Sequence, residues 1–424
     1  MSEQDKTLPL SGVRVVDFSG YVAGPFCCML LGDMGADVIK VESPTGEQWR
    51  HQDPFTPGMS KSFMALNRNK RSVVINLKDP VEREKAIKLL ETADVMVSNF
   101  RPGVAERYGL DYETLKELFP RLIFTSNTAY GPIGSRWHQP GYDLVVQAFS
   151  GLLSSNPSPD GGVPKRYAGV ALVDFTAGHY MLYGIMCALF QRYQTGKGQK
   201  VEASLLEAAL GLQRQKMLTL EGALDIPEQP GNVIEQMAST STASNAMGAR
   251  ELYYRTYQTS DGFITVGCLN VPQRQVFLKL LQMEDPWHTN PDDIPADAAI
   301  DKVRRELTVT AEERFKEHST EEWVRRFEGE GVPNAPLKML GQVMNDPEVA
   351  EGGFLYEYDY PGYGKVQSVG TGVRVGKGAS VRRPPPRLGE HTDEILEELG
   401  LINPAASAPL NKSAGHQEQR GESQ

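Results

Sequence analysis

Strand-like and helix-like segments alternate along the first two hundred residues of the chain, and this alternation limits the possible folds more than any other feature. Short runs rich in β-branched residues occur at 13–18, 36–42, 72–77, 94–100 and 122–127. Because helical stretches separate them, the pattern predicts βαβ units, which build a parallel sheet with helices on both faces. Ligands of such Rossmann-like sheets bind at the carboxyl ends of the strands. The loops SGYVAGP and NFRPG follow two of the runs, so we expect an α/β fold with its site there.

The pattern changes after about residue 220. A small, polar segment at 236–250 predicts a loop, and two strand-like runs flank TSDG as in a hairpin. Two charged helices follow, and the second opens with a capping-box pattern from Ser319 to Glu322. We therefore expect a large domain in residues 1–220, a smaller α+β domain in 221–333, a C-terminal segment in 334–403 and a disordered tail in 404–424.

The composition points to a soluble protein of a reducing compartment. A formal net charge of −10 argues against nucleic acid or an anionic membrane as the main partner. No CxxC pair occurs, and we expect buried free thiols at Cys27, Cys28, Cys187 and Cys268. The N-terminus lacks the pattern of a secretory signal, and no uninterrupted apolar run approaches the roughly 20 residues of a membrane span. We therefore expect a cytoplasmic protein with no nucleic-acid or membrane partner.

Several common chemistries lack their motifs in this sequence. A dinucleotide site would place Glu42 on the ribose, but the first loop has Gly20 and Gly24 without a GxGxxG fingerprint. The histidines lack zinc-site spacing and no GxSxG elbow occurs, so we expect no metal site and no serine hydrolase. A helix N-terminus after the first strand can still hold a phosphate. Six cations near the predicted strand ends and loops favour an anion site: Lys40, Arg68, Lys70, Arg71, Arg101 and Arg107.

Asp174 stands at the head of a very apolar stretch, LVDFTAGHYMLYGIMCALF. Aspartate favours helix N-caps, so Asp174, or Thr176 beside it, is expected to cap a helix that runs to about Tyr193. That helix is apolar on nearly all sides, which predicts a central, buried element. The helix dipole would hold a carboxylate at this end ionised while burial strips it of water, which suits a cap and equally a nucleophile. The local pattern leaves both roles open.

Six segments occur together along the chain: LSGVRVVDFSGYVAGPFCCMLLGDMGADVIKVE, LNRNKRSVVINL, SNFRPGVAERYGLDYETL, PGYDLVVQAFSGLL, DFTAGHYMLYGIMCALFQRYQTGKGQKVEASLLEA and PRLGEHTDEIL. With these segments, from about Leu8 to Leu401, the sequence resembles the class III CoA-transferases. That family includes formyl-CoA transferase, carnitine CoA-transferases and α-methylacyl-CoA racemase.

The resemblance implies a Rossmann-like large domain completed by the C-terminal segment, a smaller α+β domain, and a homodimer whose subunits interlock like linked rings. It implies an enzyme that moves CoA from an acyl-CoA donor to a free carboxylic acid, with CoA thioesters as substrates and no permanently bound cofactor. The family's nucleophile falls on Asp174, which would form aspartyl anhydride and aspartyl-CoA thioester intermediates. The family's CoA contacts fall on Gly20, Tyr21, Val22, Ala23, Lys40, Leu66, Lys70, Asn99, Phe100 and Arg107.

An acyl-CoA racemase or epimerase of the same family is the alternative activity. Racemases of the family carry a histidine in a GHD-like motif, whereas this chain has GYD, with Tyr142 in that place. A tyrosine with an ordinary pKa of about 10 is a poor base for an α-proton, so we expect Tyr142 to line the acyl pocket or the core. His138 is the residue that could substitute as base.

A few positions bear on substrate choice. The formate- and oxalate-specific branch of the family has a run of glycines in a lid loop, and the segment 236–250 lacks it. Arg136 and Lys165 could meet the second carboxylate of a dicarboxylic acid, although exposed charges explain them as well. His391 matches a family pattern, and we expect it to cap or pack a helix. A non-catalytic binding protein is the third hypothesis.

Overall fold

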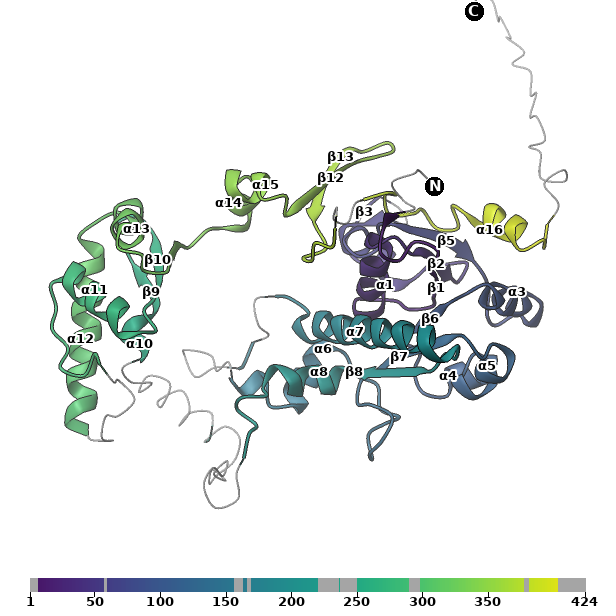
Figure 1. Cartoon of the computed structure of the whole chain (residues 1–424), viewed down its shortest axis with the longest axis horizontal. Helices are drawn as coiled ribbons and strands as arrows, with labels where there is room; N and C mark the ends of the chain where they lie inside the picture. The colour runs from purple at the N-terminus through teal and green to yellow at the C-terminus, as the bar shows by residue number, and fades with distance from the viewer. Residues whose placement is uncertain are drawn as a thin grey trace, which may run out of the picture. The chain divides into compact units, whose positions relative to one another are not determined.

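The computed structural model of the chain describes residues 7–56, 59–155, 163–165, 169–219, 236, 250–289, 298–376 and 381–402. The chain divides into two compact units (Figure 1). The first unit comprises Met1–Leu153, Arg166–Leu224 and Phe354–Gln424, and the second comprises Ser154–Lys165 and Asp225–Gly353. The end of the chain therefore returns to the first unit, as the family resemblance implies. The predicted tail at 404–424, and the predicted loop at 236–250 apart from its two end residues, lie outside the described residues.

A parallel sheet forms the centre of the first unit. Within the described residues its six strands lie in the order β5 (Lys70–Val74), β2 (Asp37–Glu42), β1 (Arg14–Asp17), β6 (Val95–Ser98), β7 (Ile123–Thr128) and β8 (Lys200–Ser204). Val16 of β1 pairs with Ile39 on one side and with Met96 on the other. The chain moves outward from β1 to β5 and then starts again at β6, so its direction reverses between β1 and β6. Ligands of open α/β sheets bind beyond the strand ends at such a switch point.

Helices cover both faces of this sheet (Figure 1). Side chains alternate along each strand, so Val15 faces α1 (Ala23–Asp33) and α7 (Leu172–Thr195), whereas Val16 faces the other side. The elements on that other side are α3 (Pro80–Glu91), α4 (Val104–Tyr108), α5 (Tyr112–Leu118) and α16 (Thr392–Glu398). The predicted α/β fold with a parallel central sheet is confirmed.

Helix α7 approaches its neighbours closely at two glycines. A Cβ atom at Gly178 would lie 2.9 Å from the backbone oxygen of Ala23 in α1. A Cβ atom at Gly184 would lie 2.5 Å from a methyl group of Val201 in β8. Such distances are shorter than carbon contacts allow, so a side chain at either position would push α7 away from the layer beneath it.

The outer face of α7 is apolar and exposed, so the prediction of a helix buried on all sides is only partly right. Its large exposed side chains are Tyr183, Met186, Phe190 and Tyr193. Cys187 is exposed as well, whereas we expected a buried thiol. By length and composition alone α7 could cross a membrane, and it is the one such helix among the described residues. Its inner face packs on α1 and the sheet as core helices of α/β units do.

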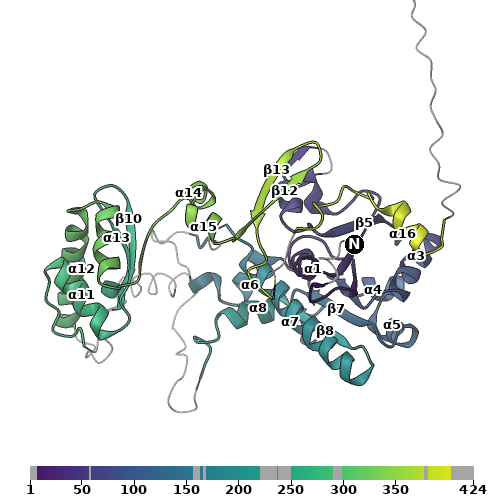
Figure 2. The same ribbon diagram turned by 45° about the horizontal axis from the view of Figure 1, so that its top comes forward.

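The C-terminal segment covers the open edge of the sheet at β5 (Figure 2). Ser72 donates its backbone N–H to Nδ1 of His391 at 3.2 Å, and Val74 donates its N–H to Oγ1 of Thr392 at 3.1 Å. The N–H of His391 in turn donates to the carbonyl of Ser72 at 3.0 Å. His391 therefore serves as an acceptor for the edge strand, and its side chain makes no capping bond to α16.

The remaining elements of the first unit are short. They are the 3₁₀ turn at Gln48–Arg50, the strand pair β3 (Pro54–Thr56) and β4 (Met59–Ser60), the helices α2 (Lys61–Met64), α6 (Asp143–Phe149) and α8 (Leu205–Leu212), and the hairpin β12 (Leu355–Tyr360) and β13 (Gly364–Val369). A further 3₁₀ turn, Leu153–Ser155, lies where the chain passes from the first unit to the second.

The second unit packs helices on a small antiparallel sheet. Its strands are β9 (Tyr254–Gln258), β10 (Phe263–Gly267) and β11 (Asn334–Pro336), and its helices are α10 (Arg250–Tyr253), α11 (Val271–Leu281), α12 (Ala298–Lys316), α13 (Thr320–Gly329), α14 (Leu340–Met344) and α15 (Pro347–Glu351). The hairpin expected around TSDG is formed by β9 and β10. Ser319 accepts the N–H of Glu322 and so caps α13 as expected. This unit extends to Gly353 and not to residue 333: strand β11, which pairs with β10, and helices α14 and α15 lie beyond that point.

Candidate active site

A cavity of about 510 Å³ opens at the carboxyl ends of the strands in the first unit. The loops after β1, β6 and β7 line it, together with the first residues of α7 and α8. Of the residues predicted from the sequence, it brings together Tyr21, Val22, Asn99, Phe100 and Asp174. The structure thus places the predicted nucleophile beside part of the predicted CoA site, at the edge of the sheet where an α/β fold binds its ligands.

The loops after β1 and β6 are joined at the switch point by one side chain. Asn99 donates its Nδ2 to the carbonyl of Gly20 at 2.8 Å, and the N–H of Gly20 donates to Oδ1 of Asn99 at 3.0 Å. The next residue, Tyr21, has φ +67°, a backbone conformation that residues other than glycine rarely adopt. Its N–H donates to a carboxylate oxygen of Glu47 at 2.8 Å. Its ring packs edge-on against Trp49 and Tyr142, with centroids 5.3 and 5.5 Å away.

Asp174 is the third residue of α7, and it does not cap that helix. Oδ1 of Asp143 accepts the N–H groups of Val173 at 2.7 Å and of Asp174 at 3.2 Å, so Asp143 in α6 is the cap. The hydroxyl of Thr176 donates to the carbonyl of Leu172 and does not cap either. The side chain of Asp174 makes no hydrogen bond or ion pair with the described part of the chain. The capping explanation of this residue is therefore wrong.

The electrostatic setting of Asp174 also differs from the one expected. Burial and, as the smaller cause, the nearby charge of Asp143 together raise its pKa to about 7. We expected the helix dipole to hold Asp174 ionised, but Asp143 already occupies the first free N–H groups of α7. Near neutral pH Asp174 therefore populates both protonation states, and its ionised form is poorly solvated. These are properties of a group that reacts.

Two of the predicted phosphate-binding lysines are buried in ion pairs under α1. Nζ of Lys70 donates to Asp17, to the carbonyl of Pro25 and to Asn67, each at 2.9 Å, so all three of its N–H groups are engaged. Nζ of Lys40 donates to the carbonyl of Ser19 at 2.8 Å and pairs with Glu47 at 3.0 Å. Both lysines stabilise the loop after β1 through these buried hydrogen bonds and ion pairs. The predicted residues that do not line the cavity are Gly20, Ala23, Lys40, Leu66, Lys70 and Arg107.

Arg101 is the cation that the described residues place on the cavity wall. It follows Phe100 in the loop after β6 and is exposed. The other cations considered from the sequence have different roles. Arg68 pairs with Asp33 at 2.7 Å in the interior, and Arg107 is an exposed residue of α4. Of the six cations that suggested an anion site, Arg101 is thus the one that the described residues place at this cavity.

The wall includes polar and aromatic residues that the sequence did not single out. They are Trp49, Asn127 and Gln139. Tyr142 lines the cavity as well, which is one of the two positions expected for it. A hydrogen bond from Tyr21 and the charge of Arg101 lower the pKa of Tyr142. Asn127, at the end of β7, is buried, and its Oδ1 has no hydrogen-bond partner in the described part of the chain. The sequence signal that could have indicated Asn127 was its position at the end of the apolar strand-like run 122–127.

The residues expected for the alternatives are not among the described residues that line this cavity. His138 is exposed, contacts Gln139 at 3.3 Å, and does not line the cavity. The Arg136 guanidinium stacks on the ring of Phe149 at 4.7 Å. Lys165 belongs to the second unit. No His, Cys, Asp and Glu cluster suited to a metal ion occurs among the described residues.

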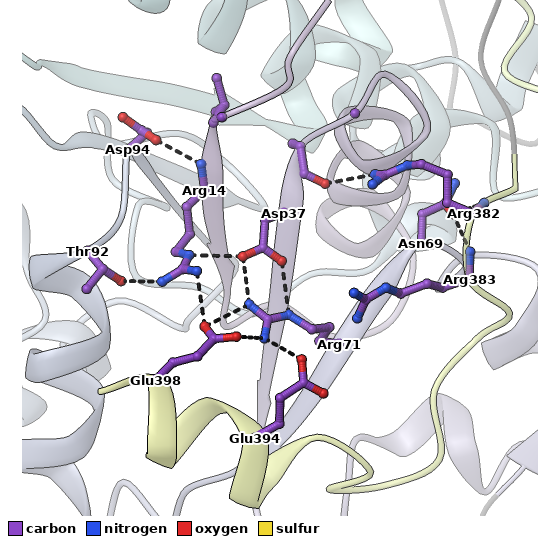
Figure 3. A pocket seen from close by; sticks show the side chains of 14 residues that line it. Arg14, Asp37, Asn69, Arg71, Thr92, Asp94, Arg382, Arg383, Glu394 and Glu398 are labelled. Carbon is purple, nitrogen blue, oxygen red and sulfur yellow. Dashed lines mark hydrogen bonds and ion pairs between the residues drawn. The ribbon is translucent and has the colours of Figure 1, made fainter. Parts of the chain in front are cut away.

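A second cavity, of about 440 Å³, lies at the opposite, amino-terminal edge of the sheet (Figure 3). Arg14 of β1 and Arg71 of β5 both point to Asp37 of β2, at 3.0 and 2.7 Å. Arg71 also pairs with Glu394 and Glu398 of α16, at 2.9 and 2.7 Å. These charges neutralise one another and attach the C-terminal helix to the sheet, so we interpret this cavity as structural.

A comparison with known protein families shows the family of the chain. The sequence model of CoA-transferase family III matches residues 10–392. The chain belongs to CoA-transferase family III. The prediction of a class III CoA-transferase from the six sequence segments is therefore confirmed.

Relatives of this CoA-transferase share most of its length. Succinyl-CoA:glutarate CoA-transferase of Homo sapiens is 35% identical over 401 residues, which cover 94% of this chain and 87% of that protein. Formyl-CoA:oxalate CoA-transferase of Rhodopseudomonas palustris (strain HaA2) is 31% identical over 420 residues, covering 96% of this chain and 97% of that protein. The crystal structure of a CAIB/BAIF family protein from Brucella suis is similar with a TM-score of 0.75 and 30% identity, covering 92% of this chain and 99% of that one.

Proposed function

We propose that this family III enzyme transfers CoA from an acyl-CoA donor to a free carboxylic acid through covalent intermediates on Asp174. One observation carries the proposal: Asp174 lines the cavity at the switch-point edge without a structural partner among the described residues. Its pKa is raised to about 7 because it is buried. A carboxylate that caps nothing, and whose ionised form is poorly solvated, is suited to nucleophilic attack.

The proposed reaction exchanges one activated carboxyl group for another in each step. An oxygen of ionised Asp174 attacks the thioester carbonyl carbon, the C–S bond breaks, and CoA leaves as a thiolate from a mixed anhydride. The thiolate attacks the Asp174 carbonyl of that anhydride, which gives an aspartyl-CoA thioester and releases the donor acid as its carboxylate. The acceptor carboxylate then attacks the carbonyl of the aspartyl-CoA thioester, which releases the CoA thiolate and forms a second mixed anhydride. The thiolate attacks the acceptor's carbonyl in this anhydride. The product is the new acyl-CoA, and the Asp174 carboxylate is regenerated.

The residues that line the cavity indicate how the acyl-CoA would lie across the sheet. Tyr21 and Phe100 line it beside the switch point, where the pantetheine arm of CoA would lie between the loops after β1 and β6. Arg101 on the same side can pair with a phosphate of CoA. The reacting carbonyl then falls at Asp174, and the acyl group extends past it toward the ends of β7 and β8.

The acids themselves are suggested by the relatives. Two relatives are named for glutarate and for oxalate as acceptors, and both of these are dicarboxylic acids. We therefore propose a dicarboxylic acid as the first acceptor class to test, with succinyl-CoA as the first donor.

Trapping experiments test the covalent mechanism. The purified protein is incubated with an acyl-CoA panel and hydroxylamine or borohydride, and the modified peptide is located by mass spectrometry. We expect modification at Asp174, and loss of transfer in Asp174→Ala and Asp174→Asn. Substantial activity in Asp174→Asn would contradict the mechanism. Exchange of the α-proton into deuterated water without modification would instead indicate a racemase.

Both variants are expected to remain folded. A carboxyl pKa raised to about 7 stabilises the folded state fully below the unfolded pKa near 4, and this stabilisation is lost as the pH rises through 7. Asp174→Asn cannot ionise, so its melting temperature relative to the wild type should rise between pH 5 and pH 8. A lower melting temperature at pH 8 would mean that the carboxylate supports the fold.

We also propose that the enzyme is a homodimer, as the family resemblance implies. The exposed apolar side chains of α7 support this assembly, because single chains rarely leave such a surface uncovered. A cytoplasmic location, and the absence of nucleic-acid and membrane partners, remain predictions from the composition.

A further inference from the structure

The side-chain amide of Asn127 is buried at the end of β7 on the wall of the cavity that holds Asp174. Only 5% of the residue is exposed, and no residue that the structure describes forms a hydrogen bond with its Oδ1. No described residue bonds its Nδ2 either. Because leaving a buried polar group unpaired costs about 1–3 kcal/mol, native proteins usually pair such groups with protein, water or ligand.

The other side-chain amides on this wall are either engaged or exposed. Both amide atoms of Asn99 bond the backbone of Gly20, at 2.8 and 3.0 Å. Gln139 is exposed, and its Nε2 contacts the ring of His138 at 3.3 Å. Among the described residues that line the cavity, Asn127 is therefore the buried side-chain amide without a protein partner.

The position of Asn127 along the sheet shows which part of a ligand it meets. Alternate side chains of β7 face one side, and Ile123 packs in the core under α1 and α7. Asn127, four residues later, lies on that same side, at the strand end nearest the cavity. The CoA side of the cavity lies at β1 and β6, whereas β7 lies on the acyl side of the proposed site. Asn127 is thus placed for the reacting acyl group and not for the phosphates of CoA.

We propose that the amide of Asn127 donates a hydrogen bond to the acyl carbonyl oxygen while Asp174 attacks, and so acts as a catalytic residue of the transfer. As the C–O bond to Asp174 forms, the carbonyl π pair moves to that oxygen and makes it negative. The Nδ2–H of Asn127 stabilises this oxyanion, the pair returns when the C–S bond breaks, and CoA leaves as a thiolate. The amide gives up no proton. This inference rests on the proposed function, because it needs the attack by Asp174.

Asn127→Leu tests the proposal, because leucine has a similar size and no donor. Loss of one oxyanion donor lowers kcat by about 10²–10³-fold, and we expect such a fall with every acyl donor and with little change in KM. Because the substitution removes an unpaired buried amide, we also expect the melting temperature of the free enzyme to rise. A residue that only supports the fold would give the opposite result, a lower melting temperature.

Thr125→Val is the matched control. Thr125 lies on the same side of β7, is fully buried, and has an unpartnered hydroxyl, but it does not line the cavity. This variant should keep the wild-type kcat.

The outcomes separate this inference from the proposed function. If the wild type transfers CoA and Asn127→Leu retains kcat within about threefold, the inference is wrong and the mechanism on Asp174 stands. A fall in kcat with a lower melting temperature, or a fall confined to some acyl groups, also overturns it. If the wild type forms no adduct at Asp174, the proposed function and this inference fail together.

Discussion

Asp143 has two effects on Asp174. Its Oδ1 accepts the two N–H groups that begin α7, and its Oδ2 accepts a bond from Gln147, so the side chain is fixed. Its charge also lies close enough to Asp174 to raise the pKa of that carboxyl beyond the effect of burial. The aspartate of the GYD motif thus positions the first turn of the helix that carries Asp174 and adds to the effect of burial on the pKa of Asp174.

Asp143→Asn separates these two effects. The asparagine oxygen can still accept the N–H groups of Val173 and Asp174, but the charge is gone, so the pKa of Asp174 should fall. In the wild type kcat/KM should rise with pH through about 7, since only the ionised carboxyl attacks. In Asp143→Asn we expect this rise at lower pH, as measured by a pH–rate profile of CoA transfer.

Asp111→Asn is the control for that profile. Asp111 caps α5 in a similar way, by accepting the N–H of Thr114, and it does not line the cavity. An unshifted profile in Asp143→Asn, or an equal shift in Asp111→Asn, would contradict the assigned effect.

The sequence predicted a nucleophile at Asp174 but not all of its surroundings. The family segments carry this prediction, whereas the local pattern left a helix cap equally open. Lys40 and Lys70 looked like phosphate ligands because a sequence does not show that their ammonium groups turn into the interior, toward Asp17 and Glu47. Asn127 was missed because a polar residue at the end of a strand is common, and only the structure shows that it has no partner.

At the scale of elements, helix α7 determines where the site is built. Its first turn carries Asp174, and the next turn carries Gly178, which lies against α1. Helix α1 follows directly on the loop that holds Tyr21. The close approach of the two helices therefore sets the distance between the nucleophile and the β1 loop.

Gly178→Ala tests this dependence. Its Cβ would lie 2.8 Å from the ring of Phe26 and 2.9 Å from the backbone oxygen of Ala23, so α7 must shift. We expect a loss of about 1–3 kcal/mol in the free energy of unfolding, typical of overpacking, together with slower CoA transfer. Denaturant unfolding and steady-state kinetics measure the two effects.

Gly341→Ala in α14 is the comparison, because a Cβ there would meet no atom within 4 Å. In an open helix position alanine is favoured over glycine, so this variant should be neutral or slightly stabilised. If the two variants were equally stable, close packing at Gly178 would not be the reason for the glycine.

Most elements of the first unit could be read from the sequence, with one clear exception. The β-branched runs became β1, β2, β6 and β7, because strands buried on both faces are nearly all apolar. Strand β8 was not predicted. It is an edge strand whose residues Lys200 and Glu202 are polar and form an ion pair with each other, so it lacks a continuous apolar run.

At the scale of the whole molecule, the exposed apolar outer face of α7 is the surface that we expect a partner subunit to cover. Tyr183, Phe190 and Tyr193 are exposed by 72%, 66% and 89%. Together with Met186 they form an apolar stripe on one side of the helix. The proposed homodimer would cover this stripe.

Phe190→Lys should weaken that dimer. A charged ammonium group would be buried against the partner subunit without a counter-ion, so we expect a larger fraction of monomer in analytical ultracentrifugation at micromolar concentration. Val81→Lys is the control, since Val81 is 73% exposed on α3, on the opposite face of the sheet. A wild type that sediments as a monomer would contradict the assembly.

The chain order of the first unit has a consequence for synthesis. The backbone of Ser72 and Val74 in β5 finds its partners in His391 and Thr392, which lie 319 and 318 residues later. A ribosome that adds about 5–20 residues per second needs roughly 15–60 s to make that length. During this interval β5 is an open edge on a nascent chain, free to pair with a neighbouring polypeptide. Each molecule is protected from this mispairing only when His391 and Thr392 have been translated.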